Sequence, residues 1–340
     1  MIALQIVWIS VLLQAVCGRV WNDTGTGSII FEEAWTTPAL LYQSTYESYN
    51  SPSFMVISCA SPCIQGIPDQ ASAEAMARSV NDQLAASIAN NTARFGGFAA
   101  LAMHNATTAA QELKRAVVEL GFLGALLNDY QESGPDNGIS HVLTISISET
   151  LLFYDQPEYD VFWEMVTELD VPVYLHPRSN IPQIQKLLYG HAPWLKGPTQ
   201  EFAVTLSTHV MGLCTNGVFD RFPNLNVIVG HLGERIPSDF WRIDDQLARE
   251  VPEGMPMLRN LSSYWGTNLF ETVSGNFATQ LFDFHKDEIG LDRILYSVDY
   301  PYVKMSQGEA WLIELSETMS SQDLLALKRG LAVDVLHLNR

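Results

Sequence analysis

Three apolar runs in the second half of the chain each end in a side chain that can bind a metal ion or carry a proton. Residues 171–175 lead to His176, residues 226–230 to His231, and residues 293–298 to Asp299. Pro177 cannot continue a buried strand, so His176 is predicted at the junction of strand and loop. In a parallel α/β barrel, catalytic residues lie at the carboxyl ends of the strands. From this stretch alone, a structural histidine in the core remains an equal alternative for His176.

The rest of the chain alternates strand-like apolar runs with amphipathic segments. In the segment 68–90, Met76, Val80, Leu84 and Ile88 recur every four residues, which predicts a helix with these side chains on its apolar face. Further helices are predicted over residues 107–120, 157–169 and 200–214. Strands are predicted over residues 28–34, 54–59, 95–101, 121–127, 171–176, 226–230, 263–270 and 293–298. Such alternation, without an internal repeat or linker, predicts a single (β/α)8 barrel over residues 28–340.

Two segments do not follow this alternation. Residues 36–53 are rich in Tyr and Ser and have no helical periodicity, although a parallel crossover normally carries a helix. We therefore expect the barrel to lack its first outer helix, unless this segment covers the first two strands in another way. Residues 129–150 are predicted to be a long surface loop, and the place of the apolar piece at 142–147 stays open.

Composition adds two limits to this picture. The chain has 340 residues, of which 47% are hydrophobic, enough for a large core. Its 38 acidic and 19 basic residues give a formal net charge of -19. A surface of this sign repels phosphate backbones, so we expect no nucleic-acid partner, and solubility explains the charge.

The first residues have the length and composition of a secretory leader. An apolar run over residues 2–16 is followed by small residues near Cys17, which predicts a signal peptide at residues 1–18 and a secreted protein. The run lacks a basic start, so a cytoplasmic location is the alternative, and no segment is long enough for a stable membrane span. Four glycosylation sequons begin at Asn22, Asn90, Asn105 and Asn260, although with 16 asparagines two or three such triplets are expected by chance.

Few cysteines remain once the leader is set aside. Cys59 and Cys63 are close enough in sequence for a small disulfide, and two buried thiols are the alternative. They have no second Cys or His pair at zinc-finger spacing, so we interpret them as structural.

The ends of the predicted strands supply a possible metal site. Glu32 ends the first strand, and together with His176 and Asp299 it offers one imidazole and two carboxylates. This mixed set suits a divalent ion such as Zn, Mn or Mg. His231 near an aspartate would serve proton transfer. Four polar residues at strand ends could instead be helix caps or partners of core groups, and spacing alone does not separate these interpretations.

Six motifs, in order along the chain, carry a family resemblance. They are Glu32-Glu-Ala34, Tyr154-Asp-Gln-Pro157, Tyr174-Leu-His-Pro-Arg178, Phe219-Asp-Arg-Phe-Pro223, Gly230-His-Leu-Gly-Glu234 and Ser297-Val-Asp-Tyr-Pro301. From about Ser28 to the C-terminus, the chain resembles the amidohydrolase-related (ACMSD-like) decarboxylases of hydroxybenzoates. That group includes the 2,3-dihydroxybenzoate and γ-resorcylate (2,6-dihydroxybenzoate) decarboxylases.

The resemblance implies a (β/α)8 barrel with one divalent metal ion, Mg, Mn or Zn, and no organic cofactor. The implied metal ligands are Glu32, His176 and Asp299. Asp299 would also protonate the ring carbon that bears the carboxylate, after which CO2 leaves. His231, with Glu234 behind it, would set the protonation state of Asp299 and hold its orientation. The implied partners are a small aromatic carboxylic acid and CO2, and the implied assembly is a homodimer or homotetramer.

Other positions refine this expectation. Ala34 stands where some relatives have a histidine ligand, which favours Mg or Mn over Zn. Arg178 and Arg235 are expected either to neutralise nearby carboxylates or to form structural ion pairs. The chain departs from the family pattern at Met211-Gly-Leu213, at Gly330-Leu-Ala332 and in the short segment after the first strand.

Two alternative functions follow from these departures. One is a metal-dependent hydrolase on the same barrel, although a His-x-His pair expected in its first strand is replaced here by Glu32-Glu-Ala34. The other is a non-catalytic or degraded secreted relative that keeps the barrel and only binds ligands. The sequence leaves the ring-substitution pattern of the substrate open.

Overall fold

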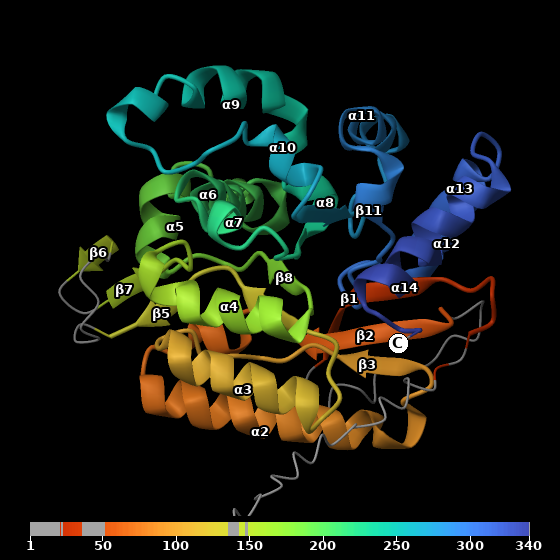
Figure 1. Ribbon diagram of the computed structural model, residues 1–340, viewed down its shortest axis with the longest axis horizontal. Coiled ribbons are helices and arrows are strands. Elements are labelled where there is room, and N and C mark those ends of the chain that lie inside the picture. The colour runs from red at the N-terminus through yellow and green to blue at the C-terminus, as the bar shows by residue number, and fades with distance from the viewer. Residues whose placement is uncertain (1–20, 22, 36–51, 135–142, 147–148, 340) are drawn as a thin grey trace, which may run out of the picture.

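The computed structural model describes residues 21, 23–35, 52–134, 143–146 and 149–339 (Figure 1). Within these residues, eight short parallel strands surround the centre of the molecule. These strands are β1 (Ile29–Trp35), β2 (Phe54–Cys59), β3 (Phe95–Gly97), β4 (Ala125–Asn128), β8 (Val173–His176), β9 (Val227–Val229), β10 (Leu269–Thr272) and β11 (Ile294–Leu295). They form two ladders, β1-β2-β3 and β4-β8-β9-β10-β11. A parallel bridge between Ala99 and Ala125 joins the ladders on one side. On the other side, Ser297 Oγ accepts hydrogen bonds of 3.1 Å from the N–H groups of Phe31 and Glu32. The predicted barrel is confirmed.

Helices lie outside the strands. They are α2 (Gln70–Ile88), α3 (Ala106–Val118), α4 (Asp160–Leu169), α5 (Pro182–Tyr189), α6 (Glu201–Thr215), α7 (Val218–Arg221), α8 (Gly230–Gly233), α9 (Phe240–Leu247), α10 (Ser262–Trp265), α11 (Thr279–Ile289), α12 (Met305–Leu315), α13 (Ser321–Leu325) and α14 (Leu331–Val335). The helices α2, α3 and α4 pack next to one another along one flank of the barrel (Figure 1). The helices predicted at 68–90, 107–120, 157–169 and 200–214 are confirmed as α2, α3, α4 and α6. Among the described helices, none combines the length and apolarity needed to cross a membrane.

The buried face of α2 differs from the predicted one. Met76 is 48% exposed, whereas the helix buries Ala73, Ala77, Asn81, Leu84 and Ile88. Small alanines let the helix approach the barrel closely, and Asn81 then bonds to the backbone of Ala100, with Nδ2 donating to its O at 3.0 Å and Oδ1 accepting from its N at 2.8 Å. The first turns of the helix therefore pack on the barrel through small residues, and Met76 lies on the outer side.

The seventh predicted strand is misplaced. The side chain of Asp244 accepts hydrogen bonds from Ser262 N at 3.2 Å and Ser262 Oγ at 2.6 Å, and the chain forms the helical turn α10 there instead of a strand. The strand begins only after Asn268, whose Nδ2 donates to the carbonyls of Pro223 and Leu225 at 3.0 and 2.9 Å. The eighth strand is also shorter than predicted and covers only Ile294–Leu295.

Part of the predicted surface loop at 129–150 is a small antiparallel sheet. Its strands are β5 (Gln131–Ser133), β6 (Leu143–Ser146) and β7 (Glu149–Leu152), in the order β5-β7-β6. The apolar piece at 142–147 is therefore mostly the strand β6. The predicted signal peptide at 1–18 and residues 36–51, where the first outer helix is expected to be missing, lie outside the described residues.

The barrel interior is apolar below the carboxyl ends of its strands. Its buried side chains include Phe31, Phe54, Phe98, Tyr174, Ile228, Phe270 and Leu295. The helix α14 contributes Ala332 and Val335 to the same cluster. Polar side chains follow this apolar layer at the carboxyl ends of the strands, so a site there rests on closely packed residues.

The two cysteine positions left open by the sequence are now assigned. Cys59 and Cys63 form a disulfide, which confirms the first of the two alternatives. Cys214 is a free, buried thiol, and burial raises its pKa. A buried thiol of this kind is inert.

Candidate metal centre

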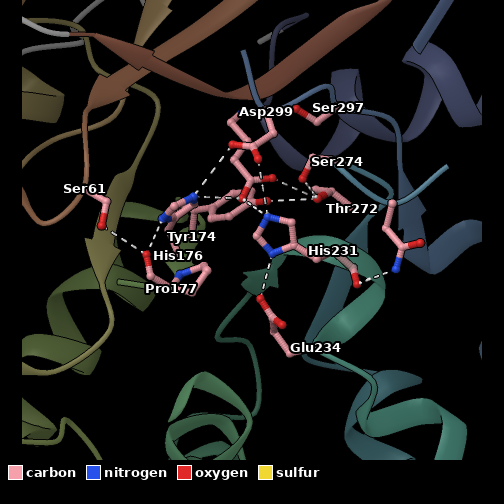
Figure 2. A network of polar contacts seen from close by, with 12 residues as sticks. Ser61, Tyr174, His176, Pro177, His231, Glu234, Thr272, Ser274, Ser297 and Asp299 are labelled. Carbon is pink, nitrogen blue, oxygen red and sulfur yellow. Dashed lines mark hydrogen bonds and ion pairs between the residues drawn. The ribbon is translucent and has the colours of Figure 1, made fainter. Parts of the chain in front are cut away.

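Four side chains converge at the carboxyl end of the barrel: Glu32 from within β1, and three from residues at or after the ends of β8, β9 and β11. Figure 2 shows these three, His176, His231 and Asp299. Ligand atoms of Glu32, His176, His231 and Asp299 all lie within 4.8 Å of one another. Glu32 Oε1 is 3.3 Å from His176 Nε2 and 3.4 Å from His231 Nε2. Asp299 Oδ1 is 4.0 Å from His176 Nε2, and Asp299 Oδ2 is 3.8 Å from His231 Nε2. The structure thus brings together the residues that the strand ends predicted.

A β-bulge aims Glu32 into this cluster. The register of β1 against β2 shifts between Ile30 and Glu33, so β1 has one extra residue there. Phe31 and Glu32, the two residues inside the bulge, both face the barrel interior, and Ala34 beyond the bulge faces the same side. Without the bulge, strict alternation would turn Glu33 inward and Glu32 outward.

Glu33 supports the loop that carries Asp299. Its Oε2 accepts a hydrogen bond of 2.9 Å from Tyr300 N, and its Oε1 accepts one of 3.3 Å from Ser297 Oγ. The backbone of Asp299 lies in the left-handed region, with φ of 74°, where a non-glycine residue is strained. Burial raises the pKa of Glu33 to about 8. Glu33 therefore contributes to the position of Asp299 and does not face the cluster.

A left-handed turn presents His231 and Glu234 together. Five consecutive residues, 231–235, have φ values of 56°, 57°, 58°, 48° and 69°. Each non-glycine residue in this conformation costs about 1–2 kcal/mol, so the surrounding structure must hold the turn. The turn places Glu234 Oε1 2.7 Å from His231 Nδ1. The carboxylate thereby orients the imidazole so that Nε2 points toward Glu32 and Asp299.

The backbone carbonyl of the next residue, Pro177, orients His176. Its Nδ1 lies 2.6 Å from the carbonyl oxygen of Pro177, which can only accept a hydrogen bond. Nδ1 therefore carries the proton in the neutral ring, and Nε2 directs its lone pair toward Glu32 and Asp299. This is the tautomer that a metal-ligating histidine needs.

The oxygen atoms of the cluster fit a divalent cation. Glu32 Oε1 and Asp299 Oδ1 are buried and have no hydrogen-bond partner among the described residues. Buried carboxylate oxygens normally have such partners, so these two atoms are candidates for bonds to a cation. Two carboxylates with one or two imidazoles form a donor set typical of Mn, Mg or Zn.

The pKa shifts show how strongly the charges interact. Burial raises the pKa of Glu32, although His231 and His176 oppose this shift. Burial alone would lower the pKa of His231, but the negative charges of Glu32 and Glu234 raise it well above its ordinary value. Burial would likewise raise the pKa of Asp299, yet the neighbouring imidazoles of His176 and His231 lower it.

A row of hydroxyl groups lies beneath Glu32. Thr272 Oγ1 donates to Glu32 Oε2 at 3.4 Å, and it lies 2.9 Å from Tyr174 OH and 2.8 Å from Ser274 Oγ. A Cβ atom at Gly230 would lie 2.7 Å from Glu32 Oε1, so this position has room only for glycine. Sequence reasoning missed Thr272 and Ser274 because it placed the seventh strand too early.

A pocket that is open to solvent lies beside the cluster. The residues that line it are Glu32, Ala34, Ser58, Cys59, Ala60, Ser61, Leu126, Asn128, His176, Asp299 and Tyr302. Ala34 leaves space where a larger side chain would fill the pocket. Glu32 and Asp299, which carry the two unpaired oxygens, thus form part of the pocket wall.

The two arginines highlighted in the sequence lie away from the cluster. Arg178 is buried, forms an ion pair with Glu132 and lies over the ring of Tyr130 at 4.8 Å. It therefore neutralises a carboxylate, but not one of the four cluster residues. Arg235 is exposed and donates to Gln200 Oε1 at 2.7 Å. Neither alternative for Arg235 is found: among the described residues it forms no ion pair, and it donates instead to Gln200 and to the carbonyl of Thr199.

Comparisons with known proteins agree with this geometry. The model of the amidohydrolase family matches residues 61–339, so the chain belongs to that family. It is 39% identical over 287 residues to the gamma-resorcylate decarboxylase of Rhodococcus jostii (strain RHA1), covering 84% of each chain. It is 42% identical over 258 residues to the gamma-resorcylate decarboxylase of Rhizobium radiobacter, covering 76% of this chain and 75% of the relative.

Solved structures of two dihydroxybenzoate decarboxylases share this fold. The fold matches dihydroxybenzoic acid decarboxylase from Polaromonas sp. JS666, solved with bound manganese and the inhibitor 2-nitroresorcinol, with a TM-score of 0.80 and 34% identity over 93% of this chain and 98% of that chain. It matches 2,6-dihydroxybenzoate decarboxylase from Rhizobium with the same TM-score and identity, over 93% of this chain and 100% of that chain. The resemblance stated from the six motifs is confirmed.

Proposed function

We propose that this protein is a metal-dependent, non-oxidative decarboxylase of a hydroxybenzoate-type aromatic acid, and hence a carbon–carbon lyase. One observation carries the proposal: Glu32 Oε1 and Asp299 Oδ1 are buried, unpaired and directed at His176 beside an open pocket. This arrangement suits a cation, and it occurs on the fold of relatives named gamma-resorcylate decarboxylase and dihydroxybenzoic acid decarboxylase.

Glu32, His176 and Asp299 would hold one divalent ion, and manganese suits their oxygen-rich donor set best. Ala34 offers no additional imidazole, which disfavours zinc. When bound, the ion would offset the negative charge of the substrate and fix its orientation.

The proton needed by the reaction is supplied by the chain itself. Asp299 donates it to the ring carbon that bears the carboxylate, which interrupts the aromatic system. The bond between that carbon and the carboxylate then breaks, its electron pair returns to the ring, and CO2 leaves. His231, 3.8 Å from Asp299 and with a raised pKa, replenishes the proton, and Glu234 keeps its imidazole aligned.

Two measurements on the purified protein test this proposal. Metal analysis is expected to find about one divalent ion per chain, as a single three-ligand site requires. CO2 release is then measured with 2,3-dihydroxybenzoate, 2,6-dihydroxybenzoate and salicylate. Turnover of at least one of them is expected. Bound metal without turnover of any hydroxybenzoate would contradict the decarboxylase function and leave a binding role.

The alternative functions have less support. A hydrolase of this superfamily would use a His-x-His pair where this chain has Glu32-Glu33-Ala34. A protein that only binds ligands has less support because relatives 39% and 42% identical to this chain are named as decarboxylases.

We further propose that the protein is secreted. The Cys59–Cys63 disulfide suits an oxidising compartment. Three sequon asparagines among the described residues, Asn90, Asn105 and Asn260, are exposed and accessible to glycosylation. Expression in a secreting eukaryotic host, followed by glycosidase treatment of the medium, tests this proposal. Retention of unglycosylated protein inside the cells would contradict it.

We also propose a homodimer or homotetramer. Large apolar side chains remain exposed in the second half of the chain, including Trp194 at 88% and Trp241 at 81%. Exposed aromatic residues of this size are typical of protein interfaces. Sedimentation analysis of the full chain should give a mass of two or four subunits, and a monomer at micromolar concentration would contradict the proposal.

A further inference from the structure

The Cys59–Cys63 disulfide lies at the edge of the candidate metal centre. Cys59 is the last residue of β2 and lines the same pocket as Asp299. Cys63 begins the helical turn Cys63–Gly66, so the bridge closes a loop over residues 59–63 between the strand and the turn. Both cysteines are half-buried, in contrast to the buried thiol of Cys214. The bridge is therefore accessible to a reductant in solution.

The closed loop holds Ser61 against the backbone next to His176. Ser61 Oγ donates a hydrogen bond of 3.2 Å to the carbonyl oxygen of Pro177, and His176 Nδ1 lies 2.6 Å from the same oxygen (Figure 2). One carbonyl thus accepts hydrogen bonds both from the loop and from a candidate metal ligand. The hydroxyl fixes the direction of this carbonyl, and the carbonyl fixes the tautomer and the ring orientation of His176.

The same segment contacts the chain after His176 at a second point. Gln65 lies in the helical turn that Cys63 begins, and its carbonyl oxygen accepts a hydrogen bond of 2.7 Å from Arg178 Nη1. Gln65 is buried. Because Arg178 is only two residues beyond His176, Ser61 and Gln65 together anchor the backbone that follows this ligand.

Opening of the bridge would release this anchoring. A loop that is cross-linked at both ends has few conformations, and it regains entropy when the cross-link is removed. The entropy regained by each freed residue is comparable with the net free energy of one hydrogen bond, so Ser61 alone would not hold the loop. Cys63 also has a φ of 45°, a left-handed conformation that a non-glycine residue keeps only under constraint.

We propose that the Cys59–Cys63 disulfide and Ser61 are positioning groups for His176, and that reduction of the disulfide weakens metal binding. This inference rests on the proposed function, because it concerns the affinity of the same site for its ion. The site thus binds its ion more tightly in an oxidising compartment than in a reducing one.

The reductant in this switch is a dithiol. One of its thiolates attacks a sulfur of the bridge, the S–S bond breaks, and the second thiol of the reductant resolves the mixed disulfide. Two electrons and two protons pass to the protein, which gains the thiols of Cys59 and Cys63, and the dithiol is oxidised to a cyclic disulfide.

Manganese affinity measures the positioning role without relying on turnover. The metal-depleted full chain is titrated with manganese by isothermal titration calorimetry, first oxidised and then reduced with dithiothreitol. The dithiol is removed under inert gas before the titration, because thiols bind metal ions. Reduction should weaken manganese binding by about tenfold, and reoxidation should restore it.

Two variants of Ser61 test the hydroxyl with the bridge intact. Ser61→Ala should weaken manganese binding by about three- to tenfold, because the Pro177 carbonyl loses its donor. Ser61→Thr keeps the hydroxyl and should bind manganese like the wild-type protein. Reduction of Ser61→Ala should have a smaller effect than reduction of wild type, since bridge and hydroxyl act on the same carbonyl. A bridge that only stabilised the fold would not produce this non-additivity.

Cysteine variants separate the bridge from other effects of the reductant. Cys59→Ala/Cys63→Ala should have the manganese affinity of the reduced wild-type protein and should not respond to dithiothreitol. Cys214→Ala is the matched control, because it removes a thiol outside the loop, and it should respond to the reductant as wild type does. If the double variant did not fold, the two Ser61 variants would still decide.

The outcomes distinguish this inference from the proposed function. Equal manganese affinity of the oxidised and the reduced protein would overturn the inference, as would an unchanged affinity in Ser61→Ala. Loss of the folded state on reduction, seen by circular dichroism, would give the bridge a structural role only and also overturn it. In each case, CO2 release from a hydroxybenzoate by the oxidised protein would leave the decarboxylase function standing. Manganese binding as expected, without turnover of any hydroxybenzoate, would overturn the function and leave the positioning role.

Discussion

Among the buried groups that combine histidine with carboxylate, two lie on opposite sides of the same barrel wall. The first is the candidate metal centre on the interior side. The second lies outside β10, where both carboxylate oxygens of Glu271 contact His285 Nδ1 at 2.8 and 3.1 Å. Ser238 Oγ lies 3.0 Å from the other ring nitrogen of His285. Both Glu271 and His285 are fully buried.

The two groups differ in the satisfaction of their polar atoms. In the Glu271–His285 pair, each carboxylate oxygen and each ring nitrogen has a partner. In the metal centre, an oxygen of Glu32 and one of Asp299 have none among the described residues. A satisfied buried pair holds elements together, whereas an unsatisfied one is completed by a ligand. Residue types alone therefore do not distinguish a structural group from a functional one.

The satisfied pair also supports the functional one. A Cβ atom at Gly233 would lie 2.7 Å from Glu271 Oε2, so the carboxylate packs directly against the left-handed turn that carries His231 and Glu234. Ser238 follows that turn and is linked to α11 through His285. The turn is thus supported from behind by a group that takes no part in the proposed chemistry.

The largest effect is expected from Asp299→Asn. The amide keeps the shape of the side chain but cannot deliver a proton, so CO2 release should fall by about 10³-fold or more. The circular dichroism spectrum and melting temperature should stay close to those of the wild-type protein. Retained turnover in this variant would contradict the proton-donor role of Asp299.

Glu271→Ala should instead lower stability. It leaves His285 buried without its partner, at an expected cost of about 3 kcal/mol in the free energy of unfolding. Urea unfolding of the metal-free proteins measures this cost. Replacing both residues by leucine should recover part of the loss, because no polar atom is then left unpaired. A variant Glu271→Ala as stable as wild type would show that the pair is not structural.

Glu32→Gln should weaken metal binding without lowering the stability of the metal-free protein. Loss of one carboxylate ligand should weaken manganese binding by about 100-fold, while the metal-free protein should be as stable as wild type or more stable by about 1 kcal/mol. Glu33→Gln is the matched control, since Glu33 faces away from the cluster, and it should lose less than about tenfold in affinity. Equal losses in both variants would contradict the assignment of Glu32 as the ligand.

The smallest effect is a pH dependence of stability from Glu271. Burial raises its pKa in the folded protein above the ordinary value of 4.5. A raised pKa favours the protonated carboxyl in the folded state, so this contribution is present below pH 4.5 and is lost as the pH rises through the folded pKa. The free energy of unfolding of wild type relative to Glu271→Gln should therefore decrease with rising pH. Parallel curves for the two proteins would contradict the shift.

Local sequence patterns determined a large part of this fold and of its site. Apolar runs that stop at His176, His231 and Asp299 predicted strand ends, and the structure places all three side chains at the carboxyl end of the barrel. The periodicity of residues 68–90 and 107–120 likewise predicted α2 and α3. These predictions succeeded because burial of apolar side chains and the effect of proline act over a few residues.

Other features were decided only by tertiary structure. The bulge in β1 is a shift in its register against β2. It determines that Glu32 rather than Glu33 enters the site. The helical turn at Ser262 depends on Asp244, 18 residues earlier in the chain. The same holds for the pairing of Glu271 with His285. Each of these depends on contacts between residues distant in sequence, and no local pattern records which partners the fold will bring together.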